Sequence, residues 1–158
     1  MELKKPCTHC DGEAVYSQYT YRANVAGVTV SDPRQMAYVC KVCGEVLLTT
    51  GEVAGLQRRA AMTALRDLPS IRGEALRYAR KAAGLRQVDL ARLLDIAPET
   101  ISRYETSNDA VPRAVQVAMH GLLLLRESGV SLQSLIDAAT KPVGATELVV
   151  PAPTPHAA

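Results

Sequence analysis

The spacing of apolar residues changes near residue 48, from a pattern typical of strands to one typical of helices. Residues 14–39 are rich in valine and tyrosine, with turn-forming residues at Asn24, Gly27 and Asp32-Pro33. This stretch predicts a small antiparallel sheet. We therefore expect an α+β fold, in which a small N-terminal antiparallel β domain is followed by an all-α domain.

End signals predict the boundaries of several helices. Thr49-x-x-Glu52 has the form of a capping box and starts a helix that ends at Pro69. A second helical stretch, from Ile71 to Ala83, stops at Gly84, a residue suited to the left-handed conformation that follows many helices. The later helices are expected at Gln87–Leu94, at Pro98–Thr106, from Pro112 onward, and at Ser131–Ala139.

Four cysteines form two matched pairs, Cys7-x2-Cys10 and Cys40-x2-Cys43, which flank the strand-rich stretch. Each x2 loop can bring two sulfurs to the spacing of neighbouring ligands on one tetrahedral ion. Four thiolate ligands leave no open coordination position, so the ion would be structural and would not activate water. The pattern predicts one structural zinc ion per chain.

The cysteines allow other interpretations. The two pairs could be buried free thiols or disulfides, although a reducing cytoplasm disfavours disulfides. A redox Cys-x-x-Cys site needs one reactive pair at a helix N-terminus, which this arrangement does not suggest. His9, inside the first loop, could replace a ligand, but with four cysteines present we expect it to be an exposed loop residue.

Residues 85–105 have the pattern of a helix-turn-helix. Their apolar positions would pack two short helices across a tight turn, and the small side chain of Ala91 would let the helices approach. The outward face of the second helix could then reach base edges in DNA. The apolar positions are Val88, Ala91, Leu94, Ile96, Ile101 and Tyr104. The candidate DNA-binding residues are Arg86, Gln87, Glu99, Thr100, Ser102, Arg103 and Thr106.

Each of these residues suits a particular contact. Arg103 is the first candidate for base recognition, because a guanidinium can donate two parallel hydrogen bonds to guanine. Glu99 could accept from a cytosine amino group, and Thr100 and Ser102 are adaptable partners. Gln87, at the start of the preceding helix, would point its amide at the DNA backbone or an outer base. Phosphates would be neutralised by Arg80, Lys81, Arg86 and Arg92.

The charge distribution favours nucleic acid as a partner. The net charge is only +2, but residues 58–92 carry nine Lys or Arg against three acidic residues, a net charge of +6. The flanks are acidic, with −1 over residues 1–57 and −3 over residues 93–158. A positive field concentrated over residues 58–92 suits the approach of DNA phosphates. The alternative is a helical bundle that touches no DNA and whose charges are simply solvated.

Membrane, secreted and enzymatic roles find no support in the sequence. No apolar stretch approaches the roughly 20 residues that a membrane span needs, and the N-terminus lacks the apolar core of a secretory signal. We therefore expect a cytoplasmic protein. No nucleophile, base and open metal come together in the sequence, so we expect no catalysis.

These features divide the chain into four segments. Residues 1–48 are the zinc-binding β domain, residues 49–70 a connecting helix and linker, and residues 71–140 the helix-turn-helix and dimerisation domain. Residues 141–158, rich in Pro and Ala, are expected to be a disordered tail. The run Leu122–Leu125 cannot face one core with all its residues, so we expect a homodimer built through the C-terminal helices.

The span from Cys7 to about Leu125 resembles the MqsA/YgiT-type antitoxins. Two features carry the resemblance, in the family's order. The first is the pair of Cys-x2-Cys motifs, with Gly44 after the second and a long strand-rich insert between them. The second is Ile101-Ser102-Arg103-Tyr104-Glu105, within a helix-turn-helix of the XRE/Cro type.

The resemblance implies a zinc-stabilised N-terminal domain that grips a ribonuclease toxin, and a C-terminal domain that dimerises and represses its own operon. It assigns the four cysteines to zinc and base reading to Glu99 and Arg103. Glu99 departs from the Asn expected at its position, which implies a different operator sequence.

We therefore expect a dimeric transcriptional repressor that binds a palindromic operator in double-stranded DNA and is the autoregulating antitoxin of a toxin–antitoxin pair. The alternative is a stand-alone regulator whose zinc domain binds a different protein or a small effector. In either case, two recognition helices related by a two-fold axis should read half-sites about one helical turn apart, roughly 34 Å.

Overall fold

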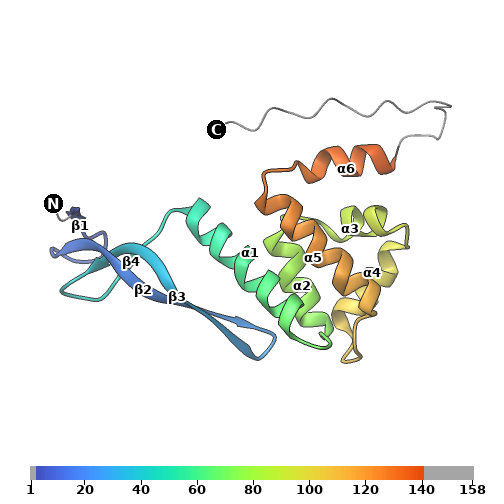
Figure 1. The fold of residues 1–158 in the computed structure, drawn as a ribbon, viewed down its shortest axis with the longest axis horizontal. Helices are drawn as coiled ribbons and strands as arrows, with labels where there is room; N and C mark the ends of the chain where they lie inside the picture. The colour runs from blue at the N-terminus through green and yellow to red at the C-terminus, as the bar shows by residue number, and fades with distance from the viewer. Residues whose placement is uncertain (1–2, 141–158) are drawn as a thin grey trace.

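The computed structural model describes residues 3–140, and an antiparallel sheet precedes a bundle of helices in it (Figure 1). The expected α+β class is therefore confirmed, whereas the expected tail, residues 141–158, lies outside the described residues. The strands are β1 (Lys4–Pro6), β2 (Glu13–Val25), β3 (Val28–Cys40) and β4 (Val46–Leu47). The helices are α1 (Thr50–Asp67), α2 (Gly73–Ala82), α3 (Gln87–Leu94), α4 (Pro98–Thr106), α5 (Arg113–Glu127) and α6 (Leu132–Ala139).

The sheet has the strand order β1-β2-β3-β4, and all neighbouring strands are antiparallel. The chain reverses between β2 and β3 at Ala26 and Gly27, whose φ angles are +52° and +84°. Positive φ at both central residues is what the tightest hairpin turns require. The Asn24 side chain accepts a hydrogen bond from the Gly27 amide at 2.8 Å. The turn signals at Asn24 and Gly27 therefore belong to one reversal.

The expected turn at Asp32-Pro33 is wrong, because both residues lie within β3. They lie opposite a register shift between Tyr19 and Tyr21 of β2. Proline cannot donate a hydrogen bond to a neighbouring strand, and sheets accommodate it at such irregularities. Asp32-Pro33 therefore marks a bulge in a long strand, and the hairpin continues past it.

The β2–β3 hairpin joins the two regions of the molecule. Ala14 pairs with Cys40 at its base, and Val25 pairs with Val28 at its tip. Val25 is only 1% exposed and belongs to the same apolar core as Ala60, Ala64 and Leu65 of α1. The sheet and the helices therefore share a core at the hairpin tip.

Helix α1 begins with the expected capping box. The Glu52 carboxylate accepts from the Thr49 amide at 2.7 Å, and the Thr49 hydroxyl accepts from the Glu52 amide at 3.2 Å. Two backbone donors at the helix start are thereby satisfied. The buried face of α1 packs against α2 and α5, so this helix contributes to the helical core as well as connecting the sheet to it.

Helices α3 and α4 have the bounds expected from the sequence, and Asp95 links them in the left-handed conformation, with φ +53°. Leu90, Ala91 and Ile101 are buried in the core, whereas Val88, expected to pack there, is exposed.

Helix α2 starts at Gly73, where a Cβ atom would lie only 2.0 Å from the Tyr104 carbonyl oxygen of α4. Only glycine fits this approach of the two helices.

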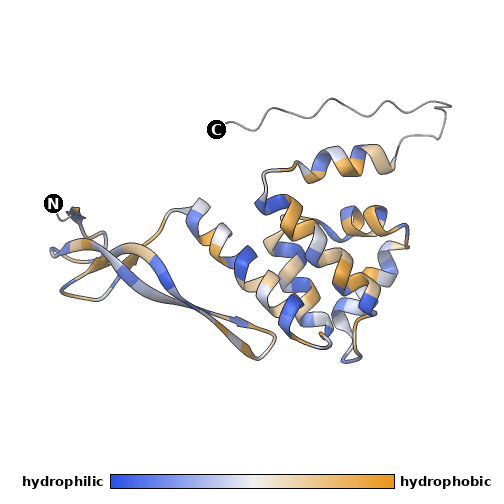
Figure 2. Ribbon diagram, viewed as in Figure 1, coloured by the Kyte–Doolittle hydropathy of each residue, from blue (hydrophilic) through white to orange (hydrophobic). Residues whose placement is uncertain are grey.

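The leucine run of α5 is divided between the core and the surface. Leu123 is fully buried, whereas Leu124 and Leu125 are exposed. Figure 2 shows strongly apolar residues along α3, α5 and α6. Even so, no helix within residues 3–140 is long and apolar enough to cross a membrane.

Candidate metal centre and nucleic-acid interface

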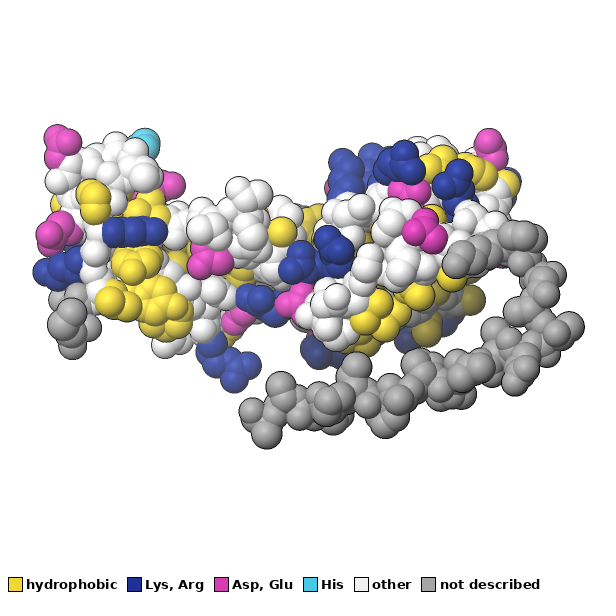
Figure 3. Space-filling model, turned by 90° about the horizontal axis from the view of Figure 1, so that it is seen from above, with side chains coloured by type: hydrophobic (Ala, Val, Ile, Leu, Met, Phe, Trp, Pro, Cys, Tyr) yellow, Lys and Arg dark blue, Asp and Glu magenta, His cyan; other side chains and the backbone are white. Residues whose placement is uncertain are grey.

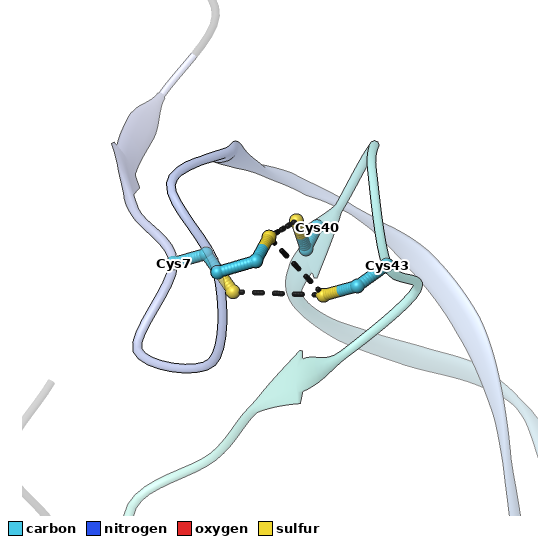
Figure 4. A group of neighbouring side chains, drawn as sticks. Cys7, Cys40 and Cys43 are labelled. Atoms are coloured by element: carbon cyan, nitrogen blue, oxygen red, sulfur yellow. Dashed lines mark hydrogen bonds between the residues drawn. The ribbon is translucent and has the colours of Figure 1, made fainter.

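The four cysteines meet at the base of the β2–β3 hairpin (Figure 4). Cys7 and Cys10 lie in the loop between β1 and β2, Cys40 ends β3, and Cys43 lies in the following turn. The sulfur–sulfur distances are 3.8 Å for Cys7–Cys43, 3.6 Å for Cys10–Cys40 and 3.5 Å for Cys10–Cys43. Sulfurs about 2.3 Å from a tetrahedral ion lie about 3.8 Å apart. The arrangement therefore has the dimensions of a site for one metal ion.

The disulfide interpretation of the cysteines does not fit this geometry. All four cysteines are free, and the closest sulfurs among them are 3.5 Å apart, whereas a disulfide bond is about 2.05 Å long. The two pairs also do not form separate buried thiol pairs, because all four sulfurs lie within 4.8 Å of one another. His9 is exposed, as expected for a loop residue outside the ligand group.

Backbone amides donate hydrogen bonds to the sulfurs of this group. The amide of His9 donates to Cys7 Sγ at 3.3 Å, and the amide of Gly12 donates to Cys10 Sγ at 3.4 Å. Backbone N–H groups of Cys43 and Val42 hydrogen-bond to the Cys40 sulfur and lower the pKa of that thiol to about 6. The Glu45 amide acts in the same direction at Cys43, but burial and the neighbouring thiols raise the pKa of Cys43 to about 12, and the thiols of Cys40 and Cys7 with burial also raise the pKa of Cys10. Deprotonated sulfur is the metal ligand, so Cys40 is the thiol that the protein itself prepares for a cation.

The exposed face of α4 carries the residues expected to read bases. Glu99, Arg103 and Thr106 are exposed, and their three- and four-residue spacing places them on one side of the helix. Ser102 lies next to this face and Thr100 at its margin, and both are half-buried. The Thr106 hydroxyl already forms a hydrogen bond within the helix, because it donates to the Ser102 carbonyl at 2.9 Å.

The two residues at the start of α3 are engaged within the protein. The Arg86 guanidinium forms two hydrogen bonds with the Asp89 carboxylate, at 2.8 and 2.9 Å, but remains 75% exposed. The Gln87 amide group was expected to point at DNA. Gln87 Nε2 donates to the Glu105 carboxylate at 2.8 Å, so the amide nitrogen is engaged within the protein and its contact with DNA stays a prediction.

Arg80 also has a different role from the expected phosphate contact. Its guanidinium is buried and donates to both Glu105 carboxylate oxygens, at 2.5 and 3.0 Å. It donates in addition to the Leu85 carbonyl at 2.7 Å. Burial alone would raise the pKa of Glu105, but hydrogen bonds from Arg80 and Gln87 lower it below its ordinary value. The Glu105 side chain is fully buried and ionised.

Sequence reasoning missed the structural role of this pair, although one signal was available. Glu105 follows Ile101 by four residues, and Ile101 is a core position. Residues four apart share a helix face, so Glu105 had to point inward. A charge on a buried face requires a partner of opposite charge, and the basic α2 supplies Arg80.

Several cations remain at the surface around the helix-turn-helix. Figure 3 shows Lys and Arg side chains gathered on the helical end of the molecule. Lys81 and Arg92, both expected to neutralise phosphates, are exposed. Arg77 is exposed too, and its guanidinium donates to the Glu105 carbonyl at 3.1 Å at the end of α4.

Comparison with known protein families agrees with this geometry. The family described as a helix-turn-helix domain matches residues 73–123, which run from the start of α2 into α5. A comparison with curated proteins and one with solved structures each find no match. A helix-turn-helix domain beside a cysteine group that can hold a metal ion indicates a DNA-binding regulator.

Proposed function

We propose that this protein is a sequence-specific transcriptional repressor whose helix α4 reads the major groove of DNA. The exposed face formed by Glu99, Arg103 and Thr106 carries this proposal. On the opposite side of the same helix, Glu105 is held by the buried Arg80. A recognition helix fixed before binding loses little conformational freedom in the groove. Arg103 is the residue best suited to select a base.

Residues at the start of α3 then hold the DNA backbone. Gln87 is the first residue of α3, and backbone N–H groups at a helix start are natural phosphate donors. Its side chain orients this helix through Glu105. Arg86 reaches solvent beside it, and Lys81 and Arg92 add positive charge. We assign sequence recognition to α4 and phosphate contacts to this group.

We assign one structural zinc ion to Cys7, Cys10, Cys40 and Cys43. Zinc favours four thiolates in a tetrahedron and, with all positions filled by protein, supplies no open site for chemistry. The region has little else to stabilise its base, because β1 and β4 are only three and two residues long. The regulator as proposed carries out no catalytic step.

The exposed apolar face of α5 supports a homodimer. Val117 is 57% exposed and Leu124 is 51% exposed, and with Gly121 they follow the i, i+4, i+7 spacing of one helix face. A Cβ atom on Gly121 would meet nothing within 4 Å, so this face is open. Pairing of two such faces about a two-fold axis would cover them and present two recognition helices to a palindromic operator.

The antitoxin role rests on the resemblance to the MqsA/YgiT-type family. In support, the β domain exposes Tyr16 and Met36, a surface that a protein partner could cover. We propose a ribonuclease toxin as that partner and the cytoplasm as the place of action. The second candidate is a stand-alone regulator, and the cleft described below favours a small effector as its signal.

Co-expression with the neighbouring open reading frames tests the antitoxin role, and mobility shift on DNA upstream of the gene tests the repressor. An antitoxin should co-purify with a partner that degrades RNA once released. A protein that shifts its upstream DNA but retains no partner would be the stand-alone regulator. Failure to shift that DNA better than scrambled DNA would contradict both roles.

A further inference from the structure

A cleft of about 580 Å³ lies where the hairpin tip meets the helix-turn-helix. One wall is Ala26 and Val28 at the tip, the second is the start of α2, and the third is the end of α4 with the residues that follow it. Small-molecule sites typically have volumes of about 300–1,000 Å³. The cleft therefore has the size of a ligand site and is formed by both regions of the protein.

Two guanidinium groups give the cleft a positive side. Arg72 and Arg77 both line it and both are exposed. Within the described residues, no carboxylate forms an ion pair with Arg72. Of the two acidic residues in the lining, Glu105 pairs with the buried Arg80 and lies 3.7 Å from Arg77 Nε, which leaves Glu74 and the unpaired Arg72. An anionic group would find at least one free guanidinium here.

Apolar atoms form the rest of the cleft. Ile71 and Ala75 are buried beneath it, and Val28 contributes an exposed side chain from the hairpin. Ser70 and Asn108 add neutral polar groups at the rim. An occupant would therefore combine an apolar body with a charged end, because it would contact the exposed Val28 and the half-buried Ala26 and Leu68 while satisfying the guanidinium.

We propose that this cleft binds a small molecule with an apolar body and a carboxylate or phosphate group. Carboxylates and phosphates share the geometry that a guanidinium recognises, so the two are tested as separate probes. Thr106, on the α4 face assigned to DNA, also lines the cleft. The role of the occupant as an effector rests on the proposed function, whereas its binding does not.

The test uses the full-length, metal-loaded protein with three probes of matched shape, namely 2-naphthoate, 2-naphthyl phosphate and the neutral 2-naphthamide. Amide chemical shifts report where each probe binds. The two anions should saturate, with the largest shifts around Ala26 and Asn108. Arg72→Gln should weaken their binding by about tenfold, the size of one charge-assisted hydrogen bond. Arg22→Gln, the same charge change on exposed β2, should leave the affinity unchanged.

Three results would overturn the assignment: no saturable binding, equal affinity for 2-naphthamide, or an unchanged affinity in Arg72→Gln. Because Arg77 also contacts Glu105, Arg77→Gln is used only as a second variant after its fold has been verified by its thermal midpoint. Operator affinity is measured separately. If the protein binds the anions but no DNA, the cleft assignment stands and the proposed function fails. If it binds the operator but neither anion, the proposed function stands and the cleft assignment fails.

Discussion

Arg80 of α2 and Glu105 of α4 form a buried, two-point ion pair, with hydrogen bonds of 2.5 and 3.0 Å. The pair ties α2 to α4, and Gln87 adds α3 to the same carboxylate. Three helices therefore take their relative positions from one side chain. The orientation of the exposed α4 surface therefore depends on a buried carboxylate on the other side of the helix.

Removal of the Glu105 carboxylate should destabilise the protein strongly. Glu105→Ala leaves Arg80 buried without its partner, a change that typically costs about 3–5 kcal/mol. Chemical denaturation, followed through helical circular dichroism, measures the effect. The matched control is Glu99→Ala on the exposed face of the same helix, which should change the unfolding free energy by less than about 0.5 kcal/mol. Equal small effects for the two variants would show that the pair contributes little.

The same pair predicts a pH dependence of stability at acid pH. Arg80 and Gln87 hold the pKa of Glu105 below its ordinary value of 4.5 in the folded state, against the effect of burial. A lowered folded-state pKa stabilises the protein above the ordinary pKa, and this contribution is lost as the pH falls through the folded pKa. Thermal midpoints from pH 7 down to pH 3 should therefore fall more steeply for the native protein than for Glu105→Gln. Parallel curves would contradict this account.

Metal content is the direct test of the cysteine group. The purified, reduced protein should contain about one zinc per chain, and chelation should expose β2 and β3 amides near the cysteines to hydrogen exchange. Cys40→Ser should lower the zinc content, while His9→Ala should not, because His9 lies outside the ligand group. Elemental analysis of the three proteins decides the matter. Equal zinc in the Cys40 variant would point to a different ligand set.

Dimerisation through α5 predicts a specific sensitivity to charge. Leu124→Glu places a carboxylate on the exposed apolar face and should yield monomers in sedimentation analysis of the full chain at low micromolar concentration. Leu3→Glu is the matched control, because Leu3 is equally exposed but lies in the β domain. A native protein that is monomeric at high micromolar concentration would remove the dimer from the account.

Local features of the fold were predictable because their signals are local. The capping box at Thr49 and the bounds of α3 and α4 follow from residues within one or two turns of each helix end. The matched cysteine spacing likewise predicted that four sulfurs would meet, and they do. In each case, the interacting groups are close in sequence or repeat a known ligand pattern.

The features that sequence reasoning missed depend on partners distant in the chain. Pro33 signals a turn unless the strand opposite it is known to shift register. Arg80 and Gln87 look like surface residues until Glu105 is placed between them. The burial of Val25 in the helical core requires knowledge of where the hairpin ends in space. Each of these relationships is set by tertiary packing, which local patterns do not report.

Base recognition by α4 is tested by the affinity of the native protein and of Arg103→Ala for cognate upstream DNA and for scrambled DNA, measured over a range of salt concentrations. Arg103→Ala should lose about 1–3 kcal/mol of binding free energy for cognate DNA and little for scrambled DNA. Arg86→Ala should instead weaken both alike and lower the salt slope by about one unit, as loss of one phosphate contact would. Equal losses on cognate and scrambled DNA for Arg103→Ala would contradict base recognition by α4.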